Sequence, residues 1–453
     1  MMKFQLYSSL LLILISYISV KSWALESHFE TVKIAPECKR LFADPKERSK
    51  STFEVFHMYG PCSPAAGTSP MNMPSAEEIL HRDRQRVQSL QARFKPNKYD
   101  SRFQDTKEVA YLPVLFSTGN YAISICLGTP QQELALVFDT GSDITWTNVF
   151  HPHSSTSLNI ITCDGTLCPW FLPHHTCEMF NNIENTCYYE IGYVDGSYSK
   201  GALCMDILNI TQTGDVFPNF LFGCSTEVGA QLQADGVLGL GRAPVAFVTQ
   251  TEPTYKRIFS YCFPSSTSST GFLKLGPRDY PNNVKFTYLV ANPDNPSFYF
   301  IDIISIRVGH VQLLIDPFDL MFPGSIIDTG TVITHLSIYI YSTMRNEFQK
   351  QMRSFGYQTV QDPSNFFDTC YHNSIQLNHI PTITFTFEGD VNVDMDASTT
   401  LYALDEWNIV CLAFVGNSDA GQFTIFGNTQ QKKLEVVYDI EGGRLGFIPG
   451  GCL

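Results

Sequence analysis

From Gly119 onward the chain is built from short runs in which apolar residues recur at every second position. The stretch YAISICLGTPQQELALVFDTG contains two such runs, separated by a Gly-Thr-Pro turn. Gly, Pro and Asn separate similar runs down to the C-terminus, which predicts β-hairpins. Two segments depart from this pattern and are predicted helices: residues 337–355 and a short piece after Gly241. We therefore expect a mainly β protein.

The region before Tyr111 has few strand-like runs and one clear helix. Ser75 and Glu78 have the spacing of a capping box, which predicts the helix start. Apolar residues then recur at roughly helical spacing, and arginines lie among them: Leu80, Val87, Leu90 and Phe94, with Arg82, Arg84, Arg86 and Arg93. The sequence predicts a basic amphipathic helix.

Charge separates the same two regions. The chain has 453 residues, 44% apolar and 16% charged, which is enough for two or three globular domains. Residues 25–110 hold 14 Lys and Arg against 12 Asp and Glu, a net of +2, whereas residues 111–453 hold 14 against 32, a net of −18. An acidic body argues against nucleic acid as a direct partner and suits a protein that works in acid.

The basic helix therefore has a candidate role. As a prosegment laid over the acidic body, it would keep an enzyme closed at neutral pH and release it when carboxylates are protonated. The alternatives are a small independent domain or a solvated helix.

The N-terminus predicts export. Lys3 precedes an apolar run over residues 10–18, and Ser22-Trp23-Ala24 fits cleavage after Ala24, so residues 1–24 are a predicted signal peptide. A signal anchor is the alternative, but the run is shorter than the ~20 residues that a membrane span needs. Thirteen cysteines, without a zinc-type CxxC pair, indicate a disulfide framework with at least one thiol left over. We expect no metal and no membrane anchor.

Two copies of one motif predict a shared site. VFDTGSDITW spans residues 137–146, and IIDTGT spans residues 326–331. Each copy has a downstream partner in which apolar residues precede a glycine: Gly239 lies 100 residues after Asp139, and Gly427 lies 99 after Asp328. This near-equality predicts a duplicated lobe, each copy of which supplies one carboxylate to a common cleft.

Two carboxylates held close together can hydrolyse a peptide bond. They cannot both ionise easily, so they share a proton: one acts as a base on water and the other protonates the carbonyl oxygen. Neither a covalent intermediate nor a cofactor is needed. A cleft between lobes would bind an extended peptide by strand pairing. Other hydrolase classes are disfavoured, because no GxSxG elbow occurs and no HExxH pattern accompanies the loop histidines His151, His153, His174 and His175.

These motifs resemble those of a known family. The segments that carry the resemblance are HMYGPCSP, PSAEEILHRDRQRVQSL, YAISICLGTPQQ, VFDTGSDITW, YVDGSYSKG, FLFGCS, DGVLGLGR, FSYCF, IIDTGT, FDTCY, CLAF and FGNTQQKKLEVVYDIEGGRLGFIPGGC. The chain resembles the pepsin-type aspartic peptidases, and within them the plant nepenthesin-like branch. The resemblance implies a bilobal pepsin-like fold, with two duplicated β-barrel-like lobes and a central cleft. The implied divisions are signal peptide 1–24, prosegment 25–110, N-terminal lobe 111–295 and C-terminal lobe 296–453.

The resemblance also implies residue roles. Asp139 and Asp328 would be the catalytic pair. Around them the two motifs supply the supporting residues: Ser142 and Thr331 to orient the carboxylates, Thr140 and Thr329 to lock the loops together, and Gly141 and Gly330 within the turns. Tyr193 would lie on a flap hairpin with Trp146 as its hydrogen-bond partner. Two departures affect this region, a shortened loop after Trp146 and Val194 where relatives usually have Gly.

Covalent features complete the expectations. The family pattern implies bridges Cys370–Cys411 and Cys262–Cys452, and a nested pair Cys163–Cys187 and Cys168–Cys177. Cys204 and Cys224 lie equally far from Gly214, so they could face each other across a hairpin, subject to geometry. Asn209 begins the glycosylation sequon Asn-Ile-Thr.

We therefore expect a secreted, monomeric, zymogen-type aspartic endopeptidase that acts at acid pH on peptides or proteins, next to bulky apolar residues. It would work in the extracellular space (apoplast), with the vacuole as the alternative. A catalytically silent binding or inhibitor protein on the same fold is the second hypothesis. Association with nucleic acid in plastids fits poorly with a signal peptide and an acidic body.

Overall fold

The computed structural model describes residues 38, 52–64, 74–93, 121–150, 154–172, 175–192, 198–210, 213–229, 234–281 and 284–451. All of them belong to one compact unit, residues 38–453. The expected signal peptide and the boundary at Tyr111 lie outside the described residues. Within the described part of the chain, no helix combines the length and the apolar character that crossing a membrane requires.

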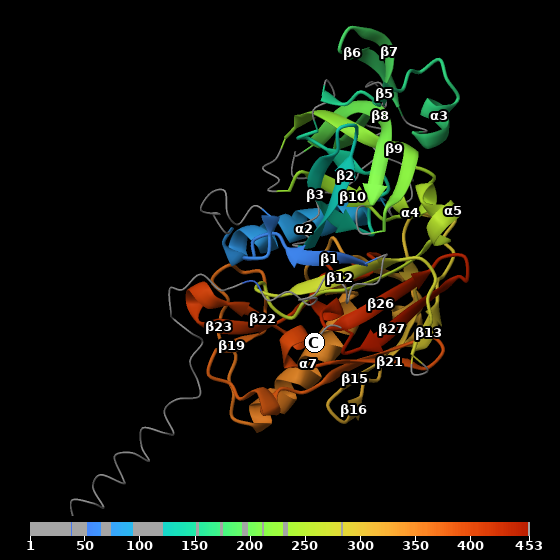
Figure 1. The fold of residues 1–453 in the computed structure, drawn as a ribbon. Helices are drawn as coiled ribbons and strands as arrows, with labels where there is room; N and C mark the ends of the chain where they lie inside the picture. Colours follow the sequence, from blue (N-terminus) through green and yellow to red (C-terminus); the bar gives the residue numbers. More distant parts are fainter. Residues whose placement is uncertain are drawn as a thin grey trace, which may run out of the picture. The chain divides into compact units, whose positions relative to one another are not determined.

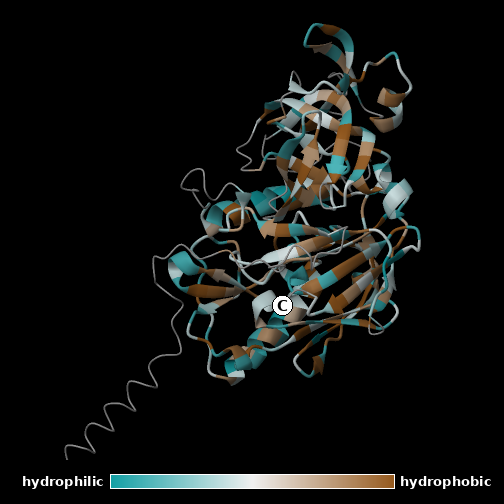
Figure 2. Ribbon diagram, in the orientation of Figure 1, coloured by the Kyte–Doolittle hydropathy of each residue, from teal (hydrophilic) through white to brown (hydrophobic). Residues whose placement is uncertain are grey.

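The first lobe is built from hairpins, as the alternating runs predict. Strands β2 and β3 pair in register from Ala122 opposite Val137 to Leu127 opposite Gln132. Their apolar residues fill a buried core, which Figure 2 shows as brown strand segments. The elements of this lobe are β2 (Tyr121–Leu127), β3 (Gln132–Asp139), β4 (Trp146–Thr147), β5 (Asn159–Ile160), α3 (Leu167–Phe171), β6 (Thr176–Phe180), β7 (Ile183–Gly192), β8 (Tyr198–Ile210), β9 (Asp215–Val228) and β10 (Gly236–Gly239).

A strand from the expected prosegment joins the sheet that links the lobes. Strand β1 (Thr52–His57) lies between β12 and β2, antiparallel to both. From β12 (Thr270–Leu275) the sheet continues, away from β1, through β11 (Ile258–Cys262), β26 (Leu434–Asp439), β27 (Arg444–Pro449) and β13 (Lys285–Tyr288). Figure 1 shows β1 in blue beside β12.

The second lobe consists of three smaller sheets. Their strands are β14 (Phe300–Ile301), β17 (Ser325–Ile327), β25 (Thr424–Phe426), β18 (Thr334–Leu336) and β24 (Phe414–Gly416); then β16 (Val311–Gln312), β15 (Ile303–Val308), β20 (Ile383–Phe387) and β21 (Val391–Met395); and β19 (Cys370–His372), β23 (Ile409–Leu412) and β22 (Leu401–Leu404).

Helices are few among the described residues. The predicted helix at 337–355 forms as α7 (Ile338–Ser354), which buries one face that includes Met344, Phe348 and Met352. The predicted piece after Gly241 forms two short helices, α4 (Phe247–Gln250) and α5 (Glu252–Tyr255). The other helices are α2 (Ala76–Arg93), α6 (Pro317–Met321), α8 (Ala397–Thr400), η4 (Leu377–His379), η5 (Asp405–Trp407) and η6 (Asn428–Gln431).

The duplicated motif is a duplicated structure. Strand β10 runs parallel to β3 and places Gly239 opposite Asp139, while β25 runs parallel to β17, which leads directly into Asp328. Both partner glycines are tightly enclosed. A Cβ on Gly239 would lie 2.1 Å from the Asp143 carbonyl oxygen, and one on Gly427 would lie 2.8 Å from the Ile333 carbonyl carbon. The repeat predicted from spacing is thus confirmed, and close backbone packing accounts for its glycines.

One expected disulfide arrangement is wrong. The structure joins Cys163 to Cys177 and Cys168 to Cys187, not the nested pairs Cys163–Cys187 and Cys168–Cys177. Burial explains the outcome. Cys168 and Cys187 are fully buried in one apolar cluster and bond to each other. Cys163 and Cys177 lie nearer the surface on the same arm, so the two outer sulfurs pair.

The remaining cysteines fall into three groups. Bridges Cys204–Cys224 and Cys370–Cys411 form, the former across the β8–β9 hairpin. A further bridge, Cys38–Cys62, joins two residues of the expected prosegment. Cys126 is free and buried, whereas Cys452, the expected partner of Cys262, lies outside the described residues. Asn209 is half-buried in β8, and Thr211 of its sequon also lies outside the described part.

Candidate active site

The first motif holds its carboxylate at the end of a strand. Asp139 is the last residue of β3 and is fully buried. Its Oδ1 accepts from the Gly141 N–H at 2.9 Å, and its Oδ2 accepts from the Ser142 hydroxyl at 2.8 Å. The turn after the strand therefore fixes both oxygens.

The second motif repeats this arrangement. Asp328 directly follows β17 and is also fully buried. Its Oδ1 accepts from the Gly330 N–H at 3.3 Å, and its Oδ2 accepts from the Thr331 hydroxyl at 2.6 Å. The two carboxylates have matching donors in matching positions.

Two threonines join the motifs across the lobe interface. The Thr140 N–H donates to Thr329 Oγ1 at 3.0 Å, and the Thr329 N–H donates to Thr140 Oγ1 at 3.0 Å. The Thr329 hydroxyl also bonds the Phe138 carbonyl oxygen at 3.2 Å. Because all these groups are buried, this reciprocal pair of hydrogen bonds fixes the two loops relative to one another.

The structure describes only the base of the expected flap hairpin. Strands β7 and β8 pair antiparallel up to Gly192 and Tyr198, as a hairpin requires. Tyr193 and Val194, which stand between them, lie outside the described residues. Trp146 is fully buried in β4, between β9 and β10.

A residue from the expected prosegment occupies the space between the carboxylates. Arg86 of α2 is fully buried, and its guanidinium reaches both aspartates. Nη2 lies 2.8 Å from Asp139 Oδ1 and 2.8 Å from Asp328 Oδ2, while Nε lies 3.0 Å from Asp328 Oδ2 and Nη1 3.1 Å from Asp139 Oδ2. Nε also donates to Thr331 Oγ1 at 3.3 Å.

The position of Arg86 Nη2 gives the geometry of the pair. One nitrogen is at hydrogen-bond distance from both carboxylates, so they face a common point rather than separate surfaces. An oxygen atom placed there would contact both acids.

The sequence comparisons bear on this geometry. Residues 121–277 match the xylanase inhibitor N-terminal family, and residues 298–449 match the xylanase inhibitor C-terminal family. The aspartyl protease AED1 of Arabidopsis thaliana is 37% identical over 89% of this chain and 87% of its own length. The chain belongs to the plant pepsin-like aspartyl protease family.

Further relatives place it within the family. Nepenthesin-2, an aspartic proteinase of Nepenthes gracilis, is 30% identical over 75% of this chain and 80% of its own length. Conglutin gamma, a basic 7S globulin from lupine seeds, has a solved structure that superposes with a TM-score of 0.61 at 22% identity, over 72% of this chain and 90% of that one. The family fold is therefore the bilobal pepsin-like one that the sequence predicts.

In this family member, α2 is capped at its start and bonded to the second lobe near its end. Its start is the predicted capping box, in which Ser75 and Glu78 exchange backbone-to-side-chain hydrogen bonds of 2.9 and 3.1 Å. Near its end, Gln91 donates to the Phe423 carbonyl oxygen at 2.7 Å and accepts from the Phe423 N–H at 2.8 Å. The Gln91 amide thus bonds the backbone as a neighbouring strand would.

Apolar residues of α2 fill two recesses of the second lobe. Leu80 is buried against Val332, Ile333 and Phe367. Val87 and Leu90 are buried in a separate cluster with the aromatic and aliphatic residues Phe298, Phe300, Ile326, Phe423 and Ile425.

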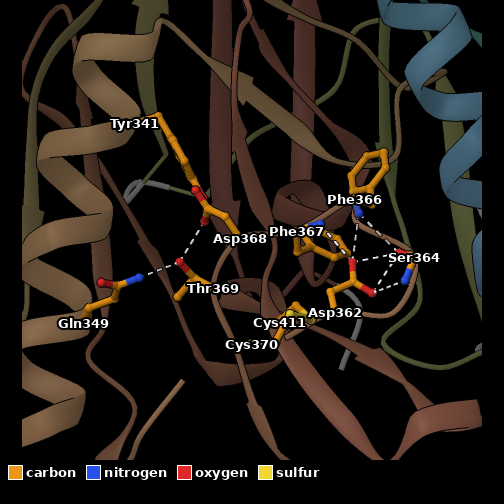
Figure 3. The surroundings of a disulfide bond; sticks show 10 residues. All are labelled: Tyr341, Gln349, Asp362, Ser364, Phe366, Phe367, Asp368, Thr369, Cys370 and Cys411. Carbon is orange, nitrogen blue, oxygen red and sulfur yellow. Dashed lines mark hydrogen bonds between the residues drawn. A yellow bond between two sulfur atoms is a disulfide. The ribbon is translucent and has the colours of Figure 1, made fainter. Parts of the chain in front are cut away.

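A loop organised by a buried carboxylate forms one wall of this contact. Asp362 accepts from the Ser364, Phe366 and Phe367 N–H groups at 2.8, 3.0 and 2.9 Å, close to the Cys370–Cys411 bridge (Figure 3). The Phe366 ring then lies 4.8 Å from the Arg84 guanidinium carbon.

Burial sets the electrostatics of the site. It raises the pKa of Asp139, an effect that the Arg86 charge opposes and the nearby Asp328 charge reinforces. Burial alone would lower the pKa of Arg86, but the two aspartates raise it above its ordinary value, so the guanidinium stays charged.

The sequence predicts the dyad but not the contacts of three residues of α2: Asp83, Arg86 and Gln91. For Asp83 a signal is present in the sequence. Positions 80, 83, 87 and 90 form one helical stripe, and a carboxylate stands at its second position. Charged residues on a buried stripe indicate polar partners on the facing surface, although the sequence does not identify them.

Proposed function

We propose that this chain is a secreted aspartic endopeptidase, made as a zymogen, which hydrolyses peptide bonds at acid pH through Asp139 and Asp328. The observation that supports it most is the common point, occupied by Arg86 Nη2, that lies within hydrogen-bond distance of both buried carboxylates. Family membership is consistent with this activity.

In the proposed mechanism, a water molecule takes the place of Nη2. The ionised aspartate accepts a proton from the water while the water oxygen attacks the peptide carbonyl carbon. The protonated aspartate donates its proton to the carbonyl oxygen. The tetrahedral gem-diol then collapses: the C–N bond breaks, the nitrogen takes up a proton from one aspartate, and a diol hydroxyl gives its proton to the other aspartate, which restores the starting dyad. Ser142 and Thr331 orient the carboxylates. The reciprocal hydrogen bonds between Thr140 and Thr329 keep the two carboxylates at a fixed separation.

The zymogen part of the proposal rests on α2. While Arg86 lies between the carboxylates, neither water nor a peptide can reach them, so the chain is inactive until α2 leaves. We place α2 in a prosegment of residues 25–110, behind a signal peptide of residues 1–24. The proposed destination is the apoplast, with the vacuole as the alternative.

Bulky apolar residues remain the proposed preference next to the cleaved bond. Val87 and Leu90 lie one to four positions after Arg86 and are buried among Phe298, Phe300 and Ile326. When α2 leaves, that recess is open beside the dyad. Apolar side chains of a substrate would fill it at about 25 cal/mol per Å² of buried apolar surface.

The test is digestion of denatured haemoglobin by the acid-processed protein between pH 2 and 6, with and without pepstatin. We expect pepstatin-sensitive cleavage, and we expect Asp139→Asn and Asp328→Asn to lower its rate at least a thousandfold, because each variant removes one member of the acid–base pair. Asp419→Asn, an exposed carboxylate in a loop of the second lobe, is the matched control and should behave as wild type.

The second candidate is a catalytically silent binding or inhibitor protein on the same fold. The family models that match are named for xylanase inhibitors, and one solved relative is a seed globulin. A processed protein without pepstatin-sensitive cleavage at any pH from 2 to 6 would favour this candidate over the enzyme.

A further inference from the structure

A second carboxylate of α2 occupies a built site beside the dyad. Asp83 is fully buried, and each of its oxygens accepts from one backbone amide: Oδ1 from the Val332 N–H at 2.7 Å and Oδ2 from the Ile333 N–H at 3.0 Å. Two successive amides that point at one carboxylate form an anion-binding concavity.

A histidine completes this concavity. The His335 side chain is about nine-tenths buried, and its Nε2 lies 3.9 Å from Asp83 Oδ2. That nitrogen has no hydrogen-bond partner in the described part of the chain. Burial, together with the Arg84 charge, lowers the pKa of His335 to about 3, so the ring is neutral while α2 is in place. A buried polar atom is costly unless an acceptor faces it, and the group that faces this nitrogen is the Asp83 carboxylate.

The site lies within reach of a bound substrate. Asp83 precedes Arg86 by three residues, which places it about 4.5 Å along the helix axis on nearly the same face. Arg86 bonds Thr331, and Asp83 bonds the next two residues of the same segment, just before β18. The concavity is therefore next to the dyad and becomes vacant when α2 leaves.

Resting on the proposed endopeptidase function, we propose that Val332 N–H, Ile333 N–H and His335 form a subsite that selects an acidic side chain of the peptide substrate. Asp83 is then an internal copy of that side chain. The chain would cleave preferentially where an aspartate or glutamate lies within one or two residues of the cleaved bond.

The chemistry of the site distinguishes an acid from its isosteres. A carboxylate has two oxygens for two amides and a negative charge for the imidazole N–H. Asparagine offers one acceptor, and its NH2 group would face an N–H donor. Leucine would leave both amides unpaired in a buried place, which is the larger loss.

The experiment uses the acid-processed protein and a panel of matched peptides at pH 5, where a substrate aspartate is ionised. One apolar cleavage sequence is varied at each position within three residues of the bond, with Asp, Asn or Leu. We expect kcat/KM for Asp to exceed that for Asn at least tenfold at one position, and to differ less than threefold at the others.

Variants assign the preference to this site. His335→Leu should lower the Asp-to-Asn ratio at least threefold, and His335→Gln, which keeps an N–H donor, should lower it less. His310→Gln, an exposed histidine in the β15–β16 turn, is the control and should leave both the ratio and the rate unchanged.

The outcomes separate this proposal from the proposed function. Cleavage of the Asn and Leu peptides without an Asp preference at any position overturns the acidic subsite while the endopeptidase function stands. A preference that His335→Leu does not change also overturns it. Failure to cleave any peptide or haemoglobin overturns both. The wild-type panel decides the first point even if the His335 variants fold poorly.

Discussion

At the scale of single residues, the geometry explains why an arginine stands between the aspartates. The guanidinium of Arg86 uses three nitrogens to contact both carboxylates and the Thr331 hydroxyl. A planar fork can satisfy two carboxylates at once, whereas a lysine ammonium is a single point charge. Removing it would leave two buried acids uncompensated, at a cost of about 3–5 kcal/mol.

Replacement of this residue should therefore make the zymogen easier to open. We expect Arg86→Gln to raise the pH at which half of the full-length protein is processed by at least one unit. Arg86→Lys should shift it less, because the charge remains while the fork is lost. Mass spectrometry of the chain after incubation between pH 3 and 7 measures the midpoint.

Arg84→Gln is the matched control for this measurement. Arg84 lies on the exposed side of the same helix and contacts the Phe366 ring and the Asn365 carbonyl oxygen, so its loss should move the midpoint by less than about 0.3 unit. An Arg86→Gln protein that is processed at the same pH as wild type would show that the contact does not hold α2 in place.

At the scale of elements, the expected prosegment is attached in two different ways. Helix α2 is held by buried side chains and by hydrogen bonds to buried backbone groups of the second lobe, whereas β1 is a strand within the linking sheet. The Cys38–Cys62 bridge also binds the segment before β1 to the turn after it. Departure of α2 thus does not by itself require departure of β1.

The arm formed by α3, β6 and β7 gives a direct test of the disulfide assignment. We expect Cys163–Cys177 and Cys168–Cys187, since the two fully buried sulfurs lie in one cluster. Non-reducing peptide mapping can separate the alternatives, because cleavage before Asp164, after Trp170 and after Met179 places the four cysteines on different peptides. Recovery of Cys163 linked to Cys187 would contradict the structure.

At the scale of the whole molecule, pH shifts the balance between a closed form, in which α2 is bound, and an open form, from which α2 has left. Burial raises the pKa of Asp139, and the Arg86 charge works against that rise while α2 is bound. When α2 leaves, the cation leaves with it, and the paired carboxylates take up a proton more readily. The open form therefore binds more protons, so a fall in pH favours it and a rise in pH stabilises the closed form.

We accordingly expect the full-length protein to stay intact and inactive at pH 7 and to be processed at pH 4. The midpoint should lie above the ordinary pKa of an aspartate, about 3.9, because the neighbouring Asp328 charge raises the pKa of Asp139 and the opposing Arg86 charge leaves with α2. Mass and haemoglobin digestion, followed together over this range, provide the measurement. Full activity of the intact chain at pH 7, or an intact chain after incubation at pH 4, would refute this mechanism.

The sequence by itself determined the features that depend on local pattern and on repetition. Alternating runs gave the hairpins, a capping box gave the start of α2, and the spacing of Asp139 and Asp328 from their partner glycines gave the duplicated lobes. These features follow from neighbouring residues, or from a repeat that is visible in the chain.

Only the tertiary structure decided which residues meet across long sequence separations. Arg86 is 53 residues from Asp139 and 242 from Asp328, and no local rule distinguishes it from Arg82 or Arg84. The same holds for Asp83 with the Val332 and Ile333 amides, and for the four cysteines of the arm, whose pairing follows burial rather than order. The physical reason is that partners at these sites are selected by which groups the packed lobes bury together, and that selection is made in three dimensions.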